Sequence, residues 1–158
     1  GCQNFWKKIG LWDRRLALLR MLRIRLDVLF LKEGKSIPPH AHRGVLSGFL
    51  MLEGSSDIRH YHVSCYNDKS VDVTLTVDKT LKPGDHTVNS DQKDNIHWLQ
   101  GVKNESVLYR FNITGLPSVM PEYKDLAGRM YVDPRNAGKN SVTEISFITE
   151  ADAKNIVF

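Results

Sequence analysis

Hydrophobic and polar residues alternate along much of this chain with the period of two that is typical of β-strands. The first clear case is residues 22–28, where apolar and charged side chains alternate strictly and predict a half-buried strand. Further short strands are predicted, in chain order, at 45–52, 58–66, 71–77, 86–89, 95–102 and 106–113. Turn residues such as Gly, Asn, Asp and Pro separate most of these runs. Many short strands at this spacing indicate an all-β sandwich or barrel.

The two ends of the chain have different patterns. Residues 4–20 place apolar side chains three and four positions apart, as an amphipathic helix does. Residues 117–142 predict a loop with room for a short helix, and 143–157 predict a strand followed by a small helix. A chain of 158 residues is expected to form a single domain, with its core at about 22–118 and a C-terminal tail at 119–158 that packs across one end.

Composition narrows the classes of function. With 41% hydrophobic and 25% charged residues, the chain is typical of soluble globular proteins. The net charge of +4 arises largely from seven basic residues before residue 26, so we expect no nucleic acid partner. No apolar run has the length of a transmembrane segment. Cys2 and Cys65 suggest no disulfide framework, which favours a cytoplasmic location, while a lipoprotein origin of Cys2 stays open.

Three histidines lie in strand contexts that would bring them together. His40 and His42 follow two prolines at positions i and i+2, so on a strand both side chains point to the same face. His97 lies far downstream, in DNIHWLQG, in a similar setting. We therefore predict that His40, His42 and His97 bind one metal ion. The alternative is a surface pair and an unrelated core histidine.

The other histidines are not expected to bind metal. His60 and His62 form a second His-x-His pair, which we place on the solvent-facing side of an alternating strand. His86 follows a Pro-Gly-Asp turn and is expected at the start of a strand. Cys65 is interpreted as a small core residue and not as a nucleophile.

The residues around the histidines resemble the motifs of the cupin superfamily. The first cupin motif is matched by Gly34, His40, His42 and Gly54. The second is matched more loosely by Pro83-Gly84-Asp85 and His97, and the usual glutamate ligand would fall near Ser47. The resemblance implies a double-stranded β-helix, a jelly-roll-like barrel. Together with the patterns at the two ends, it predicts an all-β cupin fold with an N-terminal helix and a C-terminal extension.

Within the superfamily, the chain resembles the thiol dioxygenases, of the cysteamine dioxygenase and plant cysteine oxidase type, and is also cysteine dioxygenase-like. The matching segments are PPHAHRG at 38–44, LEG at 52–54, NIH at 95–97 and FNITGLPS at 111–118. The resemblance implies that His40, His42 and His97 are iron ligands. An aspartate that supports the site in that family falls on Asn112, and a tyrosine near the pocket falls on Ser118.

Arg110 and Asn112 are the candidate catalytic residues beside the ligands. If Asn112 points into the barrel, strand alternation sends Arg110 inward as well, where its guanidinium could hold a substrate carboxylate. The competing register leaves Arg110 in solvent and buries four apolar residues instead, namely Val107, Tyr109, Phe111 and Ile113. Hydrophobicity favours this second register.

A site of three histidines has a characteristic chemistry. Two histidines and a carboxylate form the usual triad of non-haem Fe(II) oxygenases, and a third imidazole in place of the carboxylate leaves the site one unit more positive. A thiolate can supply the missing negative charge, because a coordinated thiol loses its proton. Fe(II) is therefore the expected cofactor. Zinc is the main competitor, since three histidines and a water form catalytic zinc sites, and nickel is a further alternative in the purified protein.

The leading hypothesis is an Fe(II)-dependent dioxygenase that oxidises a small thiol or an N-terminal cysteine to a sulfinic acid with O2. One alternative is a non-catalytic cupin that binds or senses a small ligand. Another is a different metal cupin, such as an isomerase or a ring-cleaving dioxygenase. A homodimer stays open, because exposed barrel strands often pair.

Overall fold

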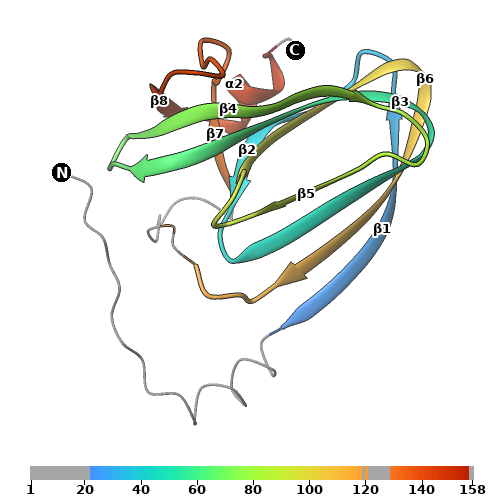
Figure 1. Ribbon diagram of the computed structural model, residues 1–158, viewed down its shortest axis with the longest axis horizontal. Coiled ribbons are helices and arrows are strands. Elements are labelled where there is room, and N and C mark those ends of the chain that lie inside the picture. Colours follow the sequence, from blue (N-terminus) through green and yellow to red (C-terminus); the bar gives the residue numbers. More distant parts are fainter. Residues whose placement is uncertain (1–21, 119, 121–128, 157–158) are drawn as a thin grey trace.

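The computed structural model describes residues 22–118, 120 and 129–156. The predicted amphipathic helix at 4–20 lies outside the described residues. Within them the chain forms eight strands and one short helix (Figure 1): β1 (Arg23–Lys32), β2 (Ser36–His42), β3 (Val45–Tyr66), β4 (Ser70–Leu81), β5 (His86–Ser90), β6 (Ile96–Thr114), β7 (Arg129–Val132), β8 (Thr143–Ile148) and α2 (Glu150–Lys154). The prediction of an all-β fold is confirmed.

Two long strands replace two pairs of predicted short ones. β3 contains both the 45–52 and the 58–66 runs, and β6 contains nearly all of the two later runs. The turn residues between the runs bend the strands without ending them. Gly54 has a φ of 76° and Asn104 a φ of 57°, and the pairing of β3 with β6 shifts register between Met51 and Ser56. Such irregularities increase strand twist and bending, and the two halves of each long strand pair with different neighbours.

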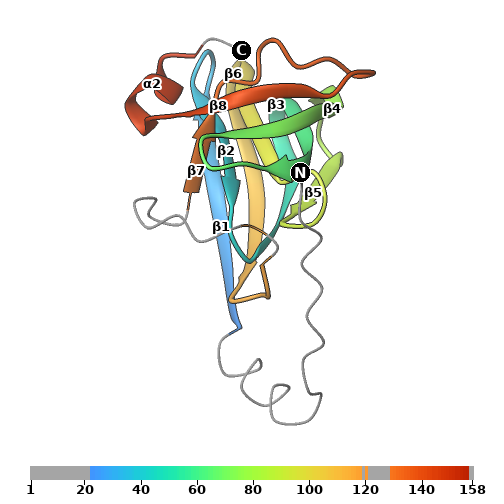
Figure 2. The same cartoon turned by 90° about the vertical axis from the view of Figure 1, so that its left-hand side faces the viewer.

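The strands close into a barrel. In the order β6, β2, β7, β8, β4 and β3, each strand pairs with the next, and the pairing of β3 with β6 completes a six-stranded ring. The predicted jelly-roll-like barrel is therefore confirmed. β1 adds to β6 and β5 adds to β3 outside the ring. We call the resulting unit β1–β6–β3–β5 the four-stranded sheet; its strands lie side by side at the lower right of Figure 1 and are seen from another side in Figure 2.

The tail forms more strand than its sequence predicts. β7 pairs with β2 in a segment that was predicted as loop, and three of its four residues are buried. Four residues are too few for alternation to be recognised. The strand and small helix predicted at 143–157 are confirmed as β8 and α2. The helix is capped by Thr149, whose hydroxyl accepts a hydrogen bond from the backbone N–H of Asp152.

Two hydrophobic clusters fill the molecule. One lies among β1, β3, β4 and β6 and contains Leu31, Phe49, Met51, Ile58, Leu81, Leu99 and Leu108. The other joins β2, β3, β4 and β6 to the tail and contains Ala41, Tyr61, Val71, Val73, Ile96, Met120, Met130, Val132, Ala137 and Ile145. The histidines of β2 and β6 alternate with residues of the second cluster, so they lie on the opposite strand face from Ala41 and Ile96.

The prediction for Cys65 is confirmed in its burial but not in its chemistry. Cys65 is buried on β3, as predicted for a core residue, but it is disulfide-bonded. Because disulfides are rare in reducing compartments, the cysteines give no support for a cytoplasmic location.

In the described part of the chain, no helix has the length and hydrophobicity needed to cross a membrane.

Candidate metal centre

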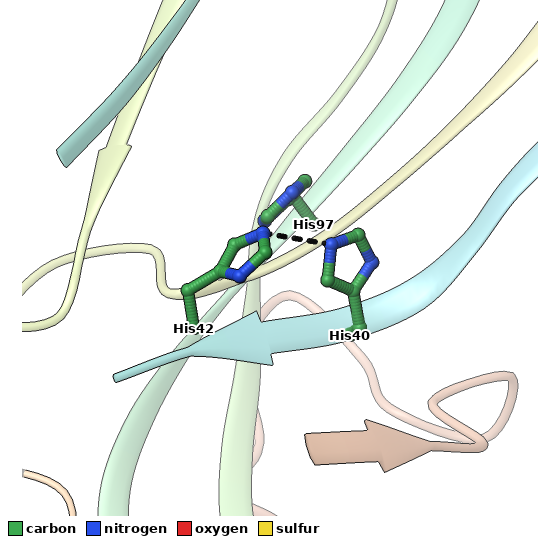
Figure 3. A group of neighbouring side chains, drawn as sticks. All are labelled: His40, His42 and His97. Carbon is green, nitrogen blue, oxygen red and sulfur yellow. Dashed lines mark hydrogen bonds between the residues drawn. The ribbon is translucent and has the colours of Figure 1, made fainter. Parts of the chain in front are cut away.

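Three histidines from two neighbouring strands meet inside the barrel (Figure 3). His40 and His42 lie on β2, and His97 lies on β6 directly opposite His40 in the register of the two strands. Each offers one ring nitrogen to the group, and these three nitrogens lie within 4.8 Å of one another. His40 and His97 are buried and His42 is half-buried. The structure thus brings together all three residues that the sequence predicts as metal ligands.

Backbone carbonyl groups fix the tautomers of two of these rings. The Nδ1 atom of His40 lies 2.7 Å from the carbonyl oxygen of Pro38, and the Nδ1 atom of His97 lies 3.1 Å from that of Asn95. A carbonyl oxygen only accepts, so the hydrogen bond to it requires a proton on Nδ1. The His97 Nδ1 also lies 3.1 Å from Asn89 Nδ2, and a proton on Nδ1 requires the Asn89 amide to turn its otherwise unpartnered oxygen toward it. With Nδ1 protonated, the Nε2 of each ring is available to a metal ion, as in known metal sites whose histidines bond to carbonyls.

The spacing and donor types of the cluster fit a metal ion. The Nε2 atoms of His40 and His42 are 2.9 Å apart, as the dashed line in Figure 3 marks. Two nitrogens in adjacent positions about 2.1 Å from one ion would lie about 3 Å apart. Among the described residues, the cluster includes no carboxylate or thiol. Three neutral imidazoles suit iron, zinc or nickel better than calcium or magnesium.

Burial keeps the imidazoles neutral. It is the main cause that lowers the pKa of His40 well below its usual 6.5, and the charges of His97 and His42 add to the effect. Burial also lowers the pKa of His97 to about 3, although the hydrogen bond to the Asn95 carbonyl acts in the opposite direction. Since the neutral ring is the form that binds metal, these ligands have no proton to lose at neutral pH.

Asn95 connects the two sides of the cluster. Its Oδ1 accepts a hydrogen bond from the backbone N–H of His42 at 3.1 Å, while its own carbonyl accepts from His97. Its Nδ2 donates to Asp91 Oδ1 at 3.2 Å and to the Tyr66 hydroxyl at 3.3 Å. This role of Asn95 was not predicted from the sequence, where the residue is only part of the NIH motif. The available signal was an amide side chain two residues before a candidate ligand, because such a side chain needs hydrogen-bond partners once it is buried.

Asn112 and Ser118, where the chain departs from the thiol dioxygenase pattern, each form a hydrogen bond within the protein. Ser47, near the place of the cupin glutamate, is buried and donates its hydroxyl to Asn112 Oδ1 at 2.7 Å. Ser118 Oγ accepts a hydrogen bond from the backbone N–H of Met120 at 3.0 Å. Neither serine belongs to the group of metal-ligand atoms.

The expectation that His60 faces solvent is wrong. It is fully buried on β3, directly opposite His97 in register, with the two ring centroids 6.4 Å apart. Its Nε2 lies 3.4 Å from Thr87 Oγ1, and its Nδ1 has no hydrogen-bond partner in the structure. Burial lowers the pKa of His60 to about 4. A register shift after His60 breaks the alternation from which its exposure was predicted.

The two remaining histidines are placed differently. His62 is half-buried and lies outside the group of metal-ligand atoms. His86 is the exposed first residue of β5, as predicted from the turn before it.

The register that hydrophobicity favours for 106–113 is also wrong. Arg110 and Asn112 alternate with exposed or half-buried apolar residues and share their strand face with Leu108, which is fully buried. Arg110 points inward and is paired with Asp27, whose Oδ2 accepts from Nε at 3.2 Å and from Nη2 at 2.6 Å. The Arg110 guanidinium, assisted by Arg25, lowers the pKa of the Asp27 carboxyl. The arginine therefore lies on the inner side with its charge already paired.

No family model and no curated protein matches this chain. Solved structures similar to it include cupin superfamily proteins. One, from Desulfitobacterium hafniense, is 16% identical over 58% of this chain and 68% of that chain, with a TM-score of 0.41. A double-stranded β-helix protein from Klebsiella pneumoniae is 14% identical over 58% of this chain and 67% of that chain, with a TM-score of 0.42. The Schizosaccharomyces pombe Cnp3 cupin domain is 11% identical over 58% of this chain and about half of that chain (52%), with a TM-score of 0.41.

Proposed function

We propose that this protein binds one Fe(II) ion through His40, His42 and His97 and oxidises a thiol to a sulfinic acid with O2. The observation that carries the proposal is the donor set, three imidazoles without a carboxylate among the ligand atoms of the described residues, of which burial keeps those of His40 and His97 neutral. When bound there, Fe(II) would supply a redox-active cation with positions open to both a thiolate and O2. The reaction balances as one thiol and one O2 giving one sulfinic acid.

The side chains of the protein select and orient the substrate in this proposal. Because the ligands are all neutral, the site is one negative charge short of the usual carboxylate triad and favours an anionic sulfur. The Nδ1 hydrogen bonds of His40 and His97 hold the rings in one orientation. Burial of these two rings also excludes water from their side of the cluster.

The ion pair between Arg110 and Asp27 bears on the class of thiol. Since Asp27 occupies Nε and Nη2 of Arg110, a substrate carboxylate would be left with the Nη1 side of the guanidinium, next to the Asp27 carboxylate that already neutralises its charge. A substrate ammonium group would instead find the Asp27 carboxylate on the same inner side. An N-terminal cysteine of a peptide, which carries an ammonium group beside its thiol, fits this pair better than an acidic thiol does.

Oxygen uptake by iron-loaded protein tests the proposal. The panel would contain cysteamine, 3-mercaptopropionate, cysteine and a peptide with an N-terminal cysteine. We expect uptake with the amine-bearing thiols and a product heavier by two oxygen atoms, which separates sulfinic acid from disulfide. The zinc form should occupy the same histidines without turnover, because zinc has no accessible redox change. His62→Gln is the matched control and should retain activity.

Two results would contradict the proposal. An iron-loaded protein that binds one of these thiols tightly yet consumes no oxygen would indicate a binding or sensor protein. Uptake that survives His97→Ala would place the chemistry elsewhere in the protein.

A further inference from the structure

The outer face of the four-stranded sheet is apolar across four strands. Residues paired directly in an antiparallel sheet share a face, and the register gives two such rows, Val28–Tyr109–Leu50, which ends at His86, and Leu26–Phe111–Gly48–Val88. We call the full set the apolar face, and it consists of Ile24, Leu26, Val28, Phe30, Leu46, Leu50, Val88, Val107, Tyr109, Phe111 and Ile113. All of these residues are exposed or half-buried.

The exposed area of this face exceeds the largest apolar patch of a typical monomer and approaches that of an interface. The four β1 residues of the apolar face are between 49% and 72% exposed, and Leu50 and Val88 are 36% and 47% exposed. At roughly 150–250 Å² per large side chain, these residues present on the order of 700 Å². The largest apolar patch of a typical monomer is about 300–600 Å². A stable protein–protein interface takes about 800 Å² from each partner.

The shape and charge of the face suit another flat sheet. A side chain at Gly48 would collide with the ring of Phe111, so the glycine lets this ring lie close against the strands. The rows that begin at Ile24, Leu26 and Val28 contain no Asp, Glu, Lys or Arg. The remaining row, Phe30–Val107, ends at the exposed Glu53, so acidic charge borders the face only at that edge. A largely uncharged face offers little to a nucleic acid or to an acidic partner. It matches another flat, largely apolar surface, and this chain carries one.

We propose that a second copy of the chain covers the apolar face by packing its own apolar face against it around a two-fold axis. In such an interface each copy contributes the same patch, and two sheets pack face to face about 10 Å apart with interdigitating side chains. The inner face, with the histidines, remains turned toward each barrel's own interior. The dimer is therefore independent of the function proposed for the metal centre.

Sedimentation equilibrium of the full chain tests this interface. We expect a mass of 36.0 kDa, twice the 18.0 kDa of one chain. Leu26→Lys places a lysine from each copy within the interface and should weaken the dimer at least about 100-fold, giving an 18.0 kDa species. The matched control is Val142→Lys, a residue 64% exposed that is outside the apolar face, and it should stay dimeric.

A second variant separates loss of the interface from loss of the fold. Leu26→Thr keeps a residue that favours strands and removes most of the apolar contact, so it should also weaken the dimer, with circular dichroism unchanged. A full chain that is monomeric at about 100 μM would overturn the proposal. If Leu26→Cys in that monomer also resists a thiol reagent, the face would belong to the chain's own residues 1–21. Dimers that persist in both Leu26 variants would overturn it as well.

Discussion

The two faces of the four-stranded sheet carry opposite kinds of side chain, one residue apart along each strand. On the outer face, Leu26 and Phe111 form part of an apolar row, whereas the neighbouring inner row joins Arg25, Asn112 and Ser47. The inner face becomes apolar from the buried Phe49, whose ring centroid lies 5.9 Å from that of His97, to the buried Leu108. The inner face therefore combines polar groups with a buried apolar core, whereas the outer face is apolar and exposed, which suits a partner.

The comparison predicts unequal costs for removing leucine from the two faces. Leu108→Ala should lower the free energy of unfolding by about 2–5 kcal/mol, because its side chain is fully buried and leaves a cavity. Leu26→Ala, at a side chain 59% exposed, should cost less than about 1 kcal/mol at concentrations where the protein is monomeric. Denaturant unfolding at low protein concentration measures both. Equal losses would mean that the faces have been assigned wrongly.

His60 makes the inner face sensitive to acid. Its pKa is about 4 in the folded protein and near 6.5 in the unfolded chain, so the unfolded chain binds more protons between these values. Stability is therefore highest above about pH 6.5 and falls as the pH approaches 4, by about 3 kcal/mol from this residue. Across that range, the free energy of unfolding of the metal-free protein should depend less steeply on pH in His60→Gln than in the unchanged protein. His86→Gln, at an exposed residue, should keep the original slope.

The hydrogen bond between Ser47 and Asn112 should contribute a smaller amount. Asn112→Leu leaves the buried hydroxyl of Ser47 without its acceptor and should cost about 1–3 kcal/mol in the free energy of unfolding. Adding Ser47→Ala should recover part of that loss, because no hydroxyl then remains unpaired. A double-mutant cycle by denaturant unfolding measures the difference. Strictly additive losses would show that the two side chains do not interact.

The meeting of the three histidines was predictable because each lies in a strand context that can be recognised from its own neighbours. His40 and His42 share a face on any strand, and His97 stands in a similar context. The strand content was also predictable from alternation, apart from the short β7. Turn residues were misleading at Gly54 and Asn104, where they bend long strands without ending them.

Which face of a strand points into the barrel was not predictable from the alternation of apolar and polar residues. Alternation separates two faces, but it does not say which one is inside. Hydrophobicity placed Tyr109 and its neighbours inside, and the structure places Arg110 there instead, where Asp27 pairs with it. That pairing depends on β1 lying beside β6, which is a contact distant in sequence. His60 was misjudged because a register shift follows it.

His40, His42 and His97 are proposed to form one metal site on the inner side of the barrel. Metal affinity tests this site, measured by competition with a chromophoric chelator using Zn(II), and Fe(II) in the absence of oxygen. We expect one ion per chain in the unchanged protein and a loss of at least about 100-fold in affinity in His97→Ala. The double variant His60→Gln/His62→Gln should bind the ion nearly as well as the unchanged protein. The opposite result, in which the double variant loses the ion and His97→Ala retains it, would contradict the account.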